Sequence, residues 1–264
     1  MIESKEIGLA LSGGGIRGAI HVGFLDAFES YRPNVKAVAG TSAGSIVGAF
    51  YCAGFTSKEI MALFKGTSLR SFVSWNGFRK GLMEMSGLKK LLEQHIPKDF
   101  SELEKPFAVT ACALDEEELL VIEEGDLHQA VLASCSIPII FQTVEINGRA
   151  CVDGGVLNSL PADVLHGRVD QVIGVHLNNM RYPSSKQDNL LVLAEKVFLM
   201  SVRHNVKRNL KYCDYFVSPE IEHTSVLDFD KIERLYHIGV KTGRDFVKNP
   251  TLFTKKEFKP QGKL

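Results

Sequence analysis

The sequence predicts an α/β protein in which helices cover both faces of a mainly parallel sheet. A continuous apolar run at residues 7–11 leads into a glycine-rich loop and then a helical pattern with one apolar face. A second apolar run at residues 35–39 leads into a Gly-x-Ser-x-Gly turn and a second helical start. Uninterrupted apolar runs are typical of parallel strands that are covered on both faces. The alternation of strand and helix therefore predicts a wound sheet.

Composition predicts one globular domain over residues 1–264. Apolar residues make up 45% and charged residues 23% of the 264, which is ordinary for a globular protein. The 31 basic and 31 acidic residues cancel, so no basic surface for nucleic acid is expected. We expect no secretory leader and no apolar stretch long enough to cross a membrane, which favours a cytoplasmic protein. No feature predicts an oligomeric state.

The five cysteines form no CxxC pair and lie mostly in apolar runs, so we expect buried, reduced thiols. No cluster of histidine and carboxylate residues has the spacing of metal ligands, so neither a metal nor a cofactor is predicted, and calcium is not expected for catalysis.

The first loop satisfies G-x-G-x-x-G through Gly13, Gly15 and Gly18. A dinucleotide-binding fold is therefore an alternative, but that fold requires an acidic residue at the end of the second strand. Residues 39–42 contain no carboxylate. This absence argues against a dinucleotide and favours another use of the glycines.

Consecutive backbone N–H groups at the start of a helix can stabilise an anion. We therefore expect the backbone of Gly13, Gly14 and Gly15 to form an oxyanion hole. Arg17 has two interpretations of equal weight: it tunes this anion site, or it is a solvated residue of the first helical turn.

The second loop places Ser42 between Gly40 and Gly44, at a strand–helix junction. A serine in such a turn needs a positive φ, which projects its hydroxyl away from the backbone. Bulk at either glycine would clash across the turn. The alternative interpretation is a tight turn in which the serine only caps the helix.

Asp153 ends a further predicted strand and precedes two glycines. Taken alone, it is typical of a turn-forming aspartate. The remaining expected strands are 106–114, 119–122, 141–146, 149–152 and 172–177, with a hairpin turn at Asn147-Gly148. The remaining expected helices are 57–66, 86–96 capped by Ser86, 126–134 capped by Asp126, a short one after 161, 189–212 and 230–248.

Two segments allow two interpretations each. Residues 69–85 are rich in large apolar side chains and form either a core-packing insertion or a mobile apolar cover over the site. The helix at 189–212 has an apolar stripe, which consists of Leu191, Ala194, Phe198, Val202, Val206 and Leu210. Its basic face carries Lys196, Arg203, Lys207, Arg208 and Lys211. Such a helix usually packs on the sheet, and contact with a membrane surface is the alternative.

Three motifs stand in one order: the glycine loop at 13–18, the serine turn at 40–44, and Asp153-Gly154-Gly155. Together they resemble the patatin-like phospholipase family from about residue 7 to residue 161, including Asn158 and Pro161. This resemblance implies a three-layer α/β/α sandwich. We expect residues 7–161 to carry the motifs, with the helices at 189–212 and 230–248 packed on the same domain.

The resemblance also implies a Ser–Asp dyad without histidine. Ser42 would be the nucleophile and Asp153 its base, and the backbone of residues 13–15 would form the oxyanion hole. The predicted protein is a serine esterase that cleaves carboxylic esters of phospholipids or related lipids through an acyl-enzyme. Its partners would be a lipid or small ester substrate and, transiently, a membrane surface.

Two alternatives remain open at this point. One is a Ser-Asp-His esterase of the α/β-hydrolase type, in which a histidine follows the acid along the chain. The candidates are His166, His176, His204, His223 and His237, whereas His21 is expected to be structural. The other is a non-catalytic nucleotide-binding module that uses the Gly13–Gly18 loop.

Overall fold

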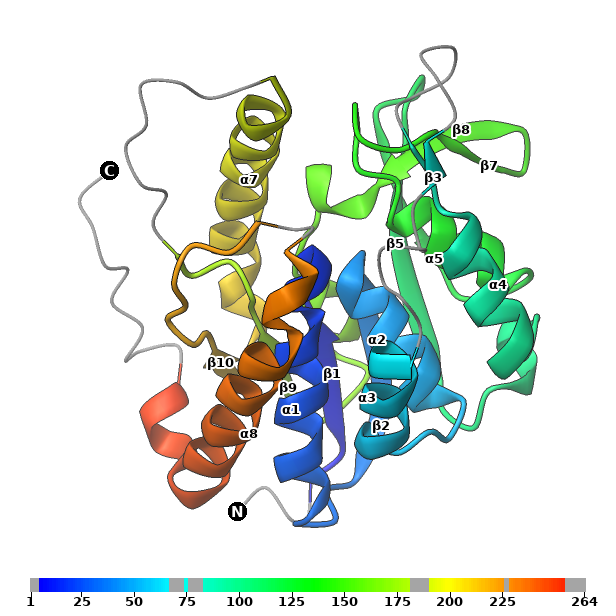
Figure 1. The fold of residues 1–264 in the computed structure, drawn as a ribbon. Helices are drawn as coiled ribbons and strands as arrows, with labels where there is room; N and C mark the ends of the chain where they lie inside the picture. Colours follow the sequence, from blue (N-terminus) through cyan, green and yellow to red (C-terminus); the bar gives the residue numbers. More distant parts are fainter. Residues whose placement is uncertain (1–4, 67–73, 76–82, 181–189, 226–227, 255–264) are drawn as a thin grey trace.

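The structure is a computed structural model that describes residues 5–66, 74–75, 83–180, 190–225 and 228–254 (Figure 1). A central sheet of eight strands runs in the order β10-β9-β1-β2-β5-β8-β7, with β6 pairing β5. Its strands are β1 (Ile7–Leu11), β2 (Val35–Thr41), β5 (Phe107–Ala113), β6 (Glu118–Ile122), β7 (Val144–Ile146), β8 (Arg149–Asp153), β9 (Gln171–Val175) and β10 (Tyr215–Val217). A separate pair is formed by β3 (Ser74–Trp75) and β4 (Met83–Glu84).

The strands from β10 to β5 are all parallel to their neighbours, and the later strands β6, β8 and β7 are antiparallel. Helices separate most of the parallel strands along the chain. These are α1 (Ala19–Glu29), α2 (Ala43–Cys52), α3 (Ser57–Gly66), α4 (Ser86–His95), α5 (Leu127–Ser134), α6 (Ala162–Leu165), α7 (Leu190–Asn209) and α8 (Ile232–Lys248).

Helices cover both faces of the sheet. In β1, Leu11 directs its Cβ toward α2, because a Cβ on Gly44 would lie 2.9 Å from it. Gly8 lies three positions before Leu11 in the same strand. A Cβ on Gly8 would lie 3.3 Å from the Cβ of Leu165 in α6. Residues an odd number apart in a strand point to opposite faces. The predicted three-layer α/β/α sandwich is confirmed.

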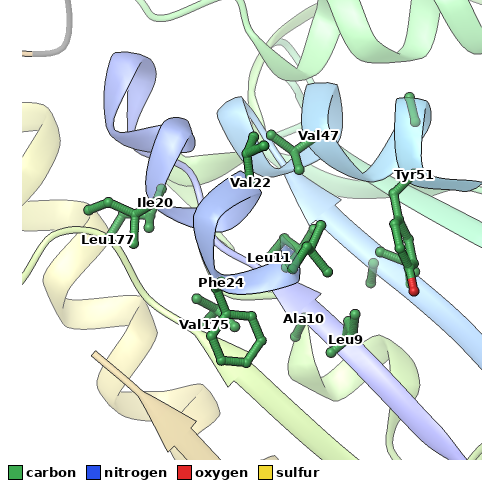
Figure 2. Close-up of a cluster of buried hydrophobic side chains, with 14 of the residues drawn as sticks. Leu9, Ala10, Leu11, Ile20, Val22, Phe24, Val47, Tyr51, Val175 and Leu177 are labelled. Carbon is green, nitrogen blue, oxygen red and sulfur yellow. The ribbon is translucent and has the colours of Figure 1, made fainter. Parts of the chain in front are cut away.

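The helices α1 and α2 form a buried apolar cluster with one face of the sheet (Figure 2). Leu9 and Leu11 of β1 pack with Val22 and Phe24 of α1 and with Val47 of α2, and all five side chains are at most 1% exposed. Each such side chain contributes about 1.5–3 kcal/mol when fully buried. This cluster fixes the positions of the two helices that begin at the glycine loop and at the serine turn.

Most predicted elements are confirmed, two differ, and the short strands β3, β4 and β10 were not predicted. Ser86 is the first residue of α4 and not its cap, since Met85 occupies the cap position without a side-chain hydrogen bond. The strand expected at 141–146 begins only at Val144, because Phe141 completes a turn whose N–H donates to the Ile137 carbonyl at 2.9 Å.

Other predictions are confirmed in detail. Asp126 caps α5 by accepting the Gln129 N–H at 2.9 Å. The hairpin at Asn147-Gly148 has positive φ at both residues, 50° and 78°, as a type I′ turn requires. All five cysteines are buried and free. The apolar segment 69–85 lies largely outside the described residues. Within the described residues, no helix combines the length and the apolar character needed to cross a membrane.

The strand β5 brings the ends of β2 and β8 together. Val109 and Thr110 pair with both β2 and β6, so these two strands lie on opposite edges of β5. Residues 111–113 pair with both β6 and β8, which places β8 on the same edge as β2. Because β2 runs parallel and β8 antiparallel to β5, their carboxyl ends point toward each other. Thr41 pairs with Thr110, and Asp153 pairs with the next residue, Ala111.

Glycines let α1 and α8 pack with their backbones in close contact. A Cβ on Gly23 would lie 2.0 Å from the Tyr236 carbonyl oxygen, and one on Gly239 would lie 2.2 Å from the Ile20 carbonyl oxygen. Backbone atoms cannot rotate away as a side chain can. The two helices can therefore stay this close only while both positions are glycine.

We predict that Gly239→Ala destabilises the protein. Alanine normally stabilises a helix interior by about 1 kcal/mol relative to glycine. Here the clash should outweigh that gain, with overpacking that costs about 1–3 kcal/mol. Urea unfolding followed by circular dichroism measures the effect, with the exposed Arg244→Ala on the same helix as control. A Gly239→Ala protein as stable as the wild type would contradict the close helix contact.

Candidate active site

Ser42 lies at the turn between β2 and α2 with a strained backbone. Its φ of 51° and ψ of −122° lie in a region that L residues rarely adopt. The turn projects the side chain away from both strand and helix, and the first N–H groups of α2 point to the same space. The predicted positive φ is confirmed.

Gly40 and Gly44 permit this turn by close backbone approach. A Cβ on Gly40 would lie 2.5 Å from the Gly44 carbonyl oxygen, and one on Gly44 would lie 2.1 Å from the Leu11 carbonyl oxygen. The predicted clash across the turn is therefore confirmed. Gly44 also ties the serine turn to the end of β1, from which the glycine loop begins.

Polar side chains hold the Ser42 backbone from both sides. Its N–H donates to the Ser134 hydroxyl at 2.8 Å, and its carbonyl accepts the Ser45 hydroxyl at 2.6 Å. Ser42 is only 5% exposed, and its hydroxyl lies close enough to the Asp153 carboxyl to lower the pKa of that group. The backbone contacts leave the hydroxyl as the group that faces the pocket.

Asp153 is completely buried at the end of β8. Burial raises the pKa of its carboxyl from 3.8 to about 7, and the Ser42 hydroxyl and the Gly155 N–H lower it in part. Oδ1 accepts the Gly155 N–H at 2.7 Å. Oδ2 forms no hydrogen bond of ordinary geometry within the described residues, and catalytic pairs often tighten only when substrate binds. The carboxyl therefore titrates close to neutrality beside a serine hydroxyl.

The two glycines after Asp153 have separate steric reasons. A Cβ on Gly154 would lie 2.3 Å from the Thr110 carbonyl oxygen of β5. A Cβ on Gly155 would lie 2.9 Å from Oδ1 of Asp153 and 3.1 Å from the Phe198 ring. The Asp-Gly-Gly motif thus places the carboxylate at the end of β8, where the chain turns in close contact with the backbone of β5.

The glycine loop does not use its three N–H groups alike. Gly13 donates its N–H to the Ser159 carbonyl at 3.1 Å, so this group is occupied. Gly14 and Gly15 make no such bond through their N–H groups within the described residues, and Gly15 has a φ of 58°. The predicted anion site therefore has two available donors, Gly14 and Gly15, while Gly13 anchors the loop.

Arg17 is completely buried, so the interpretation as a solvated residue is wrong. Its Nε donates to the Gly14 carbonyl at 2.7 Å and its Nη1 contacts Sδ of Met180 at 3.2 Å. The guanidinium thus binds the backbone of the glycine loop and adds a buried positive charge near the anion site.

One pocket collects these groups. It is narrow, and its empty space reaches roughly 240 Å³ only when the open solvent at its mouth is included. Its polar lining is Gly13, Gly14, Gly15, Arg17, Ser42, Asp153, Gly155, Ser159 and Asn178. Its apolar lining is Ile137 and, from α7, Phe198, Leu199 and Val202. The structure therefore brings Ser42, Asp153 and the three glycines to one space, beside an apolar wall.

Several polar residues around the pocket were not predicted. They are Ser134, Ser159, Asn178 and Asn205. Asn205 is 5% exposed and lies in α7 between the apolar residues Val202 and Val206. A single polar residue within an apolar helical stripe forms no motif that could be found in the sequence. Its role depends on which backbone groups it contacts in the fold.

None of the eight histidines is among the residues that line the pocket. His21 is buried with Nε2 at 2.8 Å from the Ser12 carbonyl, and burial lowers its pKa to about 4, in keeping with a structural role. His176 stacks on Phe216 and contacts the Ser218 hydroxyl at 3.1 Å, and burial lowers its pKa to about 3. His204 lies on the exposed face of α7. The geometry offers no third member for a Ser-Asp-His triad.

The family model for the patatin-like phospholipase matches residues 9–166, which is more than half of the chain. The chain belongs to the patatin-like phospholipase family. The predicted resemblance and the predicted enzyme class, a lipid hydrolase, are thereby confirmed at the level of the family. The matched residues end before α7, although this helix lines the pocket.

Curated proteins with similar sequences include lysophospholipase NTE1 of Candida albicans, which is 24% identical over 93% of this chain and 20% of its own length. The NTE1 lysophospholipase of Saccharomyces cerevisiae is 25% identical over 94% of this chain and 17% of its own length. An uncharacterized NTE family protein of Mycobacterium tuberculosis is 28% identical over 73% of this chain and 55% of its own length. The chain thus spans a fifth or less of the length of the two NTE1 relatives and about half of the length of the mycobacterial one.

Solved structures with the same fold include VipD of Legionella pneumophila, with a TM-score of 0.59 and 15% identity over 91% of this chain and 65% of that one. The type III effector ExoU gives a TM-score of 0.50 and 14% identity over 94% of this patatin-like chain and 54% of ExoU. At this identity, the likeness shows the fold.

The buried carboxyl predicts an unusual pH dependence of stability. Because the pKa of Asp153 is higher in the folded protein, the folded state keeps a proton that the unfolded state releases between pH 4 and pH 7. The free energy of unfolding should therefore fall across this range. Asp153→Asn removes the buried charge and should be more stable than the wild type at pH 8, by roughly 4 kcal/mol at most. Thermal unfolding at pH 5 and pH 8 tests this, and equal differences at both pH values would contradict it.

Proposed function

We propose that the protein hydrolyses carboxylic esters of lipids through an acyl-enzyme on Ser42, with Asp153 as the base. The observation that carries the proposal is the meeting of a strained serine, a buried carboxyl with a pKa of about 7, and two available glycine N–H groups in one pocket. Membership of the patatin-like phospholipase family supports the class of substrate.

In the first half of the reaction, Asp153 takes the proton of the Ser42 hydroxyl while the oxygen attacks the ester carbonyl. The resulting oxyanion would be stabilised by the N–H groups of Gly14 and Gly15 and by the start of α2. Loss of one such donor typically costs about 2.7–4 kcal/mol of transition-state stabilisation. Collapse of the intermediate transfers the proton from Asp153 to the leaving alcohol. In the second half, Asp153 activates a water that releases the acid from Ser42.

The pKa of the base suits this chemistry. An aspartate of ordinary pKa is a weak base for a hydroxyl, whereas one near 7 is closer to the working pH and still ionised for much of the time. Because the carboxylate is buried, few water molecules compete with the Ser42 hydroxyl for hydrogen bonds to its ionised form. The same burial that destabilises the fold therefore favours proton transfer.

The wall of the pocket suits an acyl chain. Ile137, Phe198, Leu199 and Val202 are apolar, and they lie beside Ser42 in the same cavity. Lysophospholipids are the first substrates to test, because two of the yeast relatives are named lysophospholipases. Transient contact with a membrane surface stays a prediction, as do the single domain over residues 1–264 and the cytoplasmic location.

We predict that Ser42→Ala lowers turnover of a lysophospholipid by at least about 1,000-fold, because the acyl acceptor is lost. A fluorophosphonate probe should label the wild type at Ser42, as located by peptide mass spectrometry, and should not label the variant. Circular dichroism should give the same fold for both proteins. Comparable turnover by Ser42→Ala would exclude the acyl-enzyme. Thermal stabilisation by NAD without any labelling would instead support the nucleotide-binding alternative.

We predict that kcat/KM rises with pH and reaches a plateau above about 7, because Asp153 must be ionised to accept the serine proton. Below that pH the protonated fraction increases, and activity should fall tenfold for each further pH unit. Asp153→Asn should be nearly as inactive as Ser42→Ala. A profile that stays flat from pH 5 to pH 8 would argue against Asp153 as the base, as would a mild effect of Asp153→Asn.

A further inference from the structure

One face of α7 carries a row of polar side chains that bind the segment after Asp153. Ser201, Asn205 and Asn209 are spaced four residues apart, so they share one face of the helix. The Ser201 hydroxyl donates to the Val156 carbonyl at 2.6 Å. The Asn209 amide donates to Oδ1 of Asn158 at 2.7 Å and to the Leu160 carbonyl at 3.0 Å. The helix thus holds this segment along its length.

Asn205 lies in the middle of this row and bridges two backbone segments. Its Nδ2 donates to the Gly155 carbonyl at 2.8 Å, and its Oδ1 accepts the Ser159 N–H at 2.9 Å. The side chain is 5% exposed, so water cannot easily replace either partner. One amide therefore fixes the distance between residue 155 and residue 159.

One of these segments lies one hydrogen bond from the proposed base, and the other lies one hydrogen bond from the glycine loop. On one side, the Gly155 N–H donates to Oδ1 of Asp153 at 2.7 Å. On the other side, the Ser159 carbonyl accepts the Gly13 N–H at 3.1 Å, which anchors the glycine loop. Asn205 connects the base to the oxyanion site through these bonds without touching either.

Asparagine meets this requirement because its amide offers a donor and an acceptor side by side. Alanine would leave a buried carbonyl and a buried N–H without partners. Serine carries both functions on one oxygen of a shorter side chain, so it cannot span the two partners as the amide does. A residue chosen only for helix packing would not need both functions.

We propose that Asn205 is a positioning residue that holds the Asp153 carboxylate and the glycine loop in register, so that α7 completes the active site from beyond the family-matched residues. This inference rests on the proposed function. Loss of Asn205 removes the hydrogen bond to the Gly155 carbonyl, so the backbone of Gly155 can move. This movement weakens the bond from the Gly155 N–H to the Asp153 carboxylate and so raises the pKa of Asp153. Loss of Asn205 also loosens the Ser159 carbonyl that anchors Gly13.

The experiment compares Asn205→Ala with Asn209→Ala in the full chain. Asn209 is the matched control, since it is a buried amide of the same helix that binds the same segment but touches neither Gly155 nor the Ser159 N–H. Both variants should lose thermal stability. With a soluble p-nitrophenyl ester, Asn205→Ala should lower kcat by about tenfold or more with KM within about twofold, and the acid limb of its pH profile should move to higher pH. Asn209→Ala should keep both values close to those of the wild type.

Asn205→Ser provides a second measurement if the alanine variant does not fold. It should react with the fluorophosphonate more slowly per folded molecule than both the wild type and Asn209→Ala. Asn205 variants that lose stability like Asn209→Ala, but keep the wild-type kcat and pH profile, would overturn the positioning role. Activity that survives Ser42→Ala would instead overturn the proposed function itself, so the two failures are distinguishable.

Discussion

The meeting of β2 and β8 on one edge of β5 is the constraint on which the site depends. Adjacent residues of β5, Thr110 and Ala111, pair with the last residue of each strand, Thr41 and Asp153. A buried hydrogen bond of 2.6 Å between the Thr41 and Thr110 hydroxyls joins the sheet at this point. The separation of serine and carboxylate is therefore set by backbone pairing and not by a loop, which gives the rigid placement that preorganised catalysis requires.

This placement has an energetic cost that the surrounding structure must offset. A completely buried carboxyl, a non-glycine residue with positive φ, and glycines packed against backbone oxygens all lie within a few residues of the pocket. Strained backbone and buried charge persist where a well-packed framework holds them. Here the framework is the apolar cluster between β1, α1 and α2 (Figure 2), which fixes the starts of both helices that face the pocket.

Local signals explain why much of the fold and site could be predicted from the sequence. The apolar runs at β1 and β2, the Asp126 cap and the Asn147-Gly148 turn each depend on residues close together in the chain. The motifs around residues 13, 42 and 153 predict a shared site, and all three line one pocket. The strand β10 was missed because three edge residues give no periodicity. The start of α4 was misplaced by one residue because Met85, a half-buried apolar residue without a capping side chain, takes the cap position.

The unpredicted parts of the site depend on contacts between distant segments. The sequence could not distinguish Gly13 from Gly14 and Gly15, because the difference lies in the Ser159 carbonyl, which is far away along the chain. Likewise, Arg17 is a buried support in the fold because Met180, far along the chain, contacts its guanidinium. Asn205 shows the same limit, since its two partners come from a segment about fifty residues earlier.

The contact between α1 and α8 has a consequence for how the chain is made. The face of α1 that carries Gly23 is covered by Gly239 and Gly243 of α8, about 200 residues later in the chain (Figure 1). During synthesis this surface cannot be covered until α8 has emerged, about 200 residues after α1, and ribosomes add only about 5–20 residues per second. The helical layer that contains α1 and α8 is therefore completed only after the intervening chain has been made, which leaves chaperones about 10–40 seconds to bind the uncovered face of α1 first.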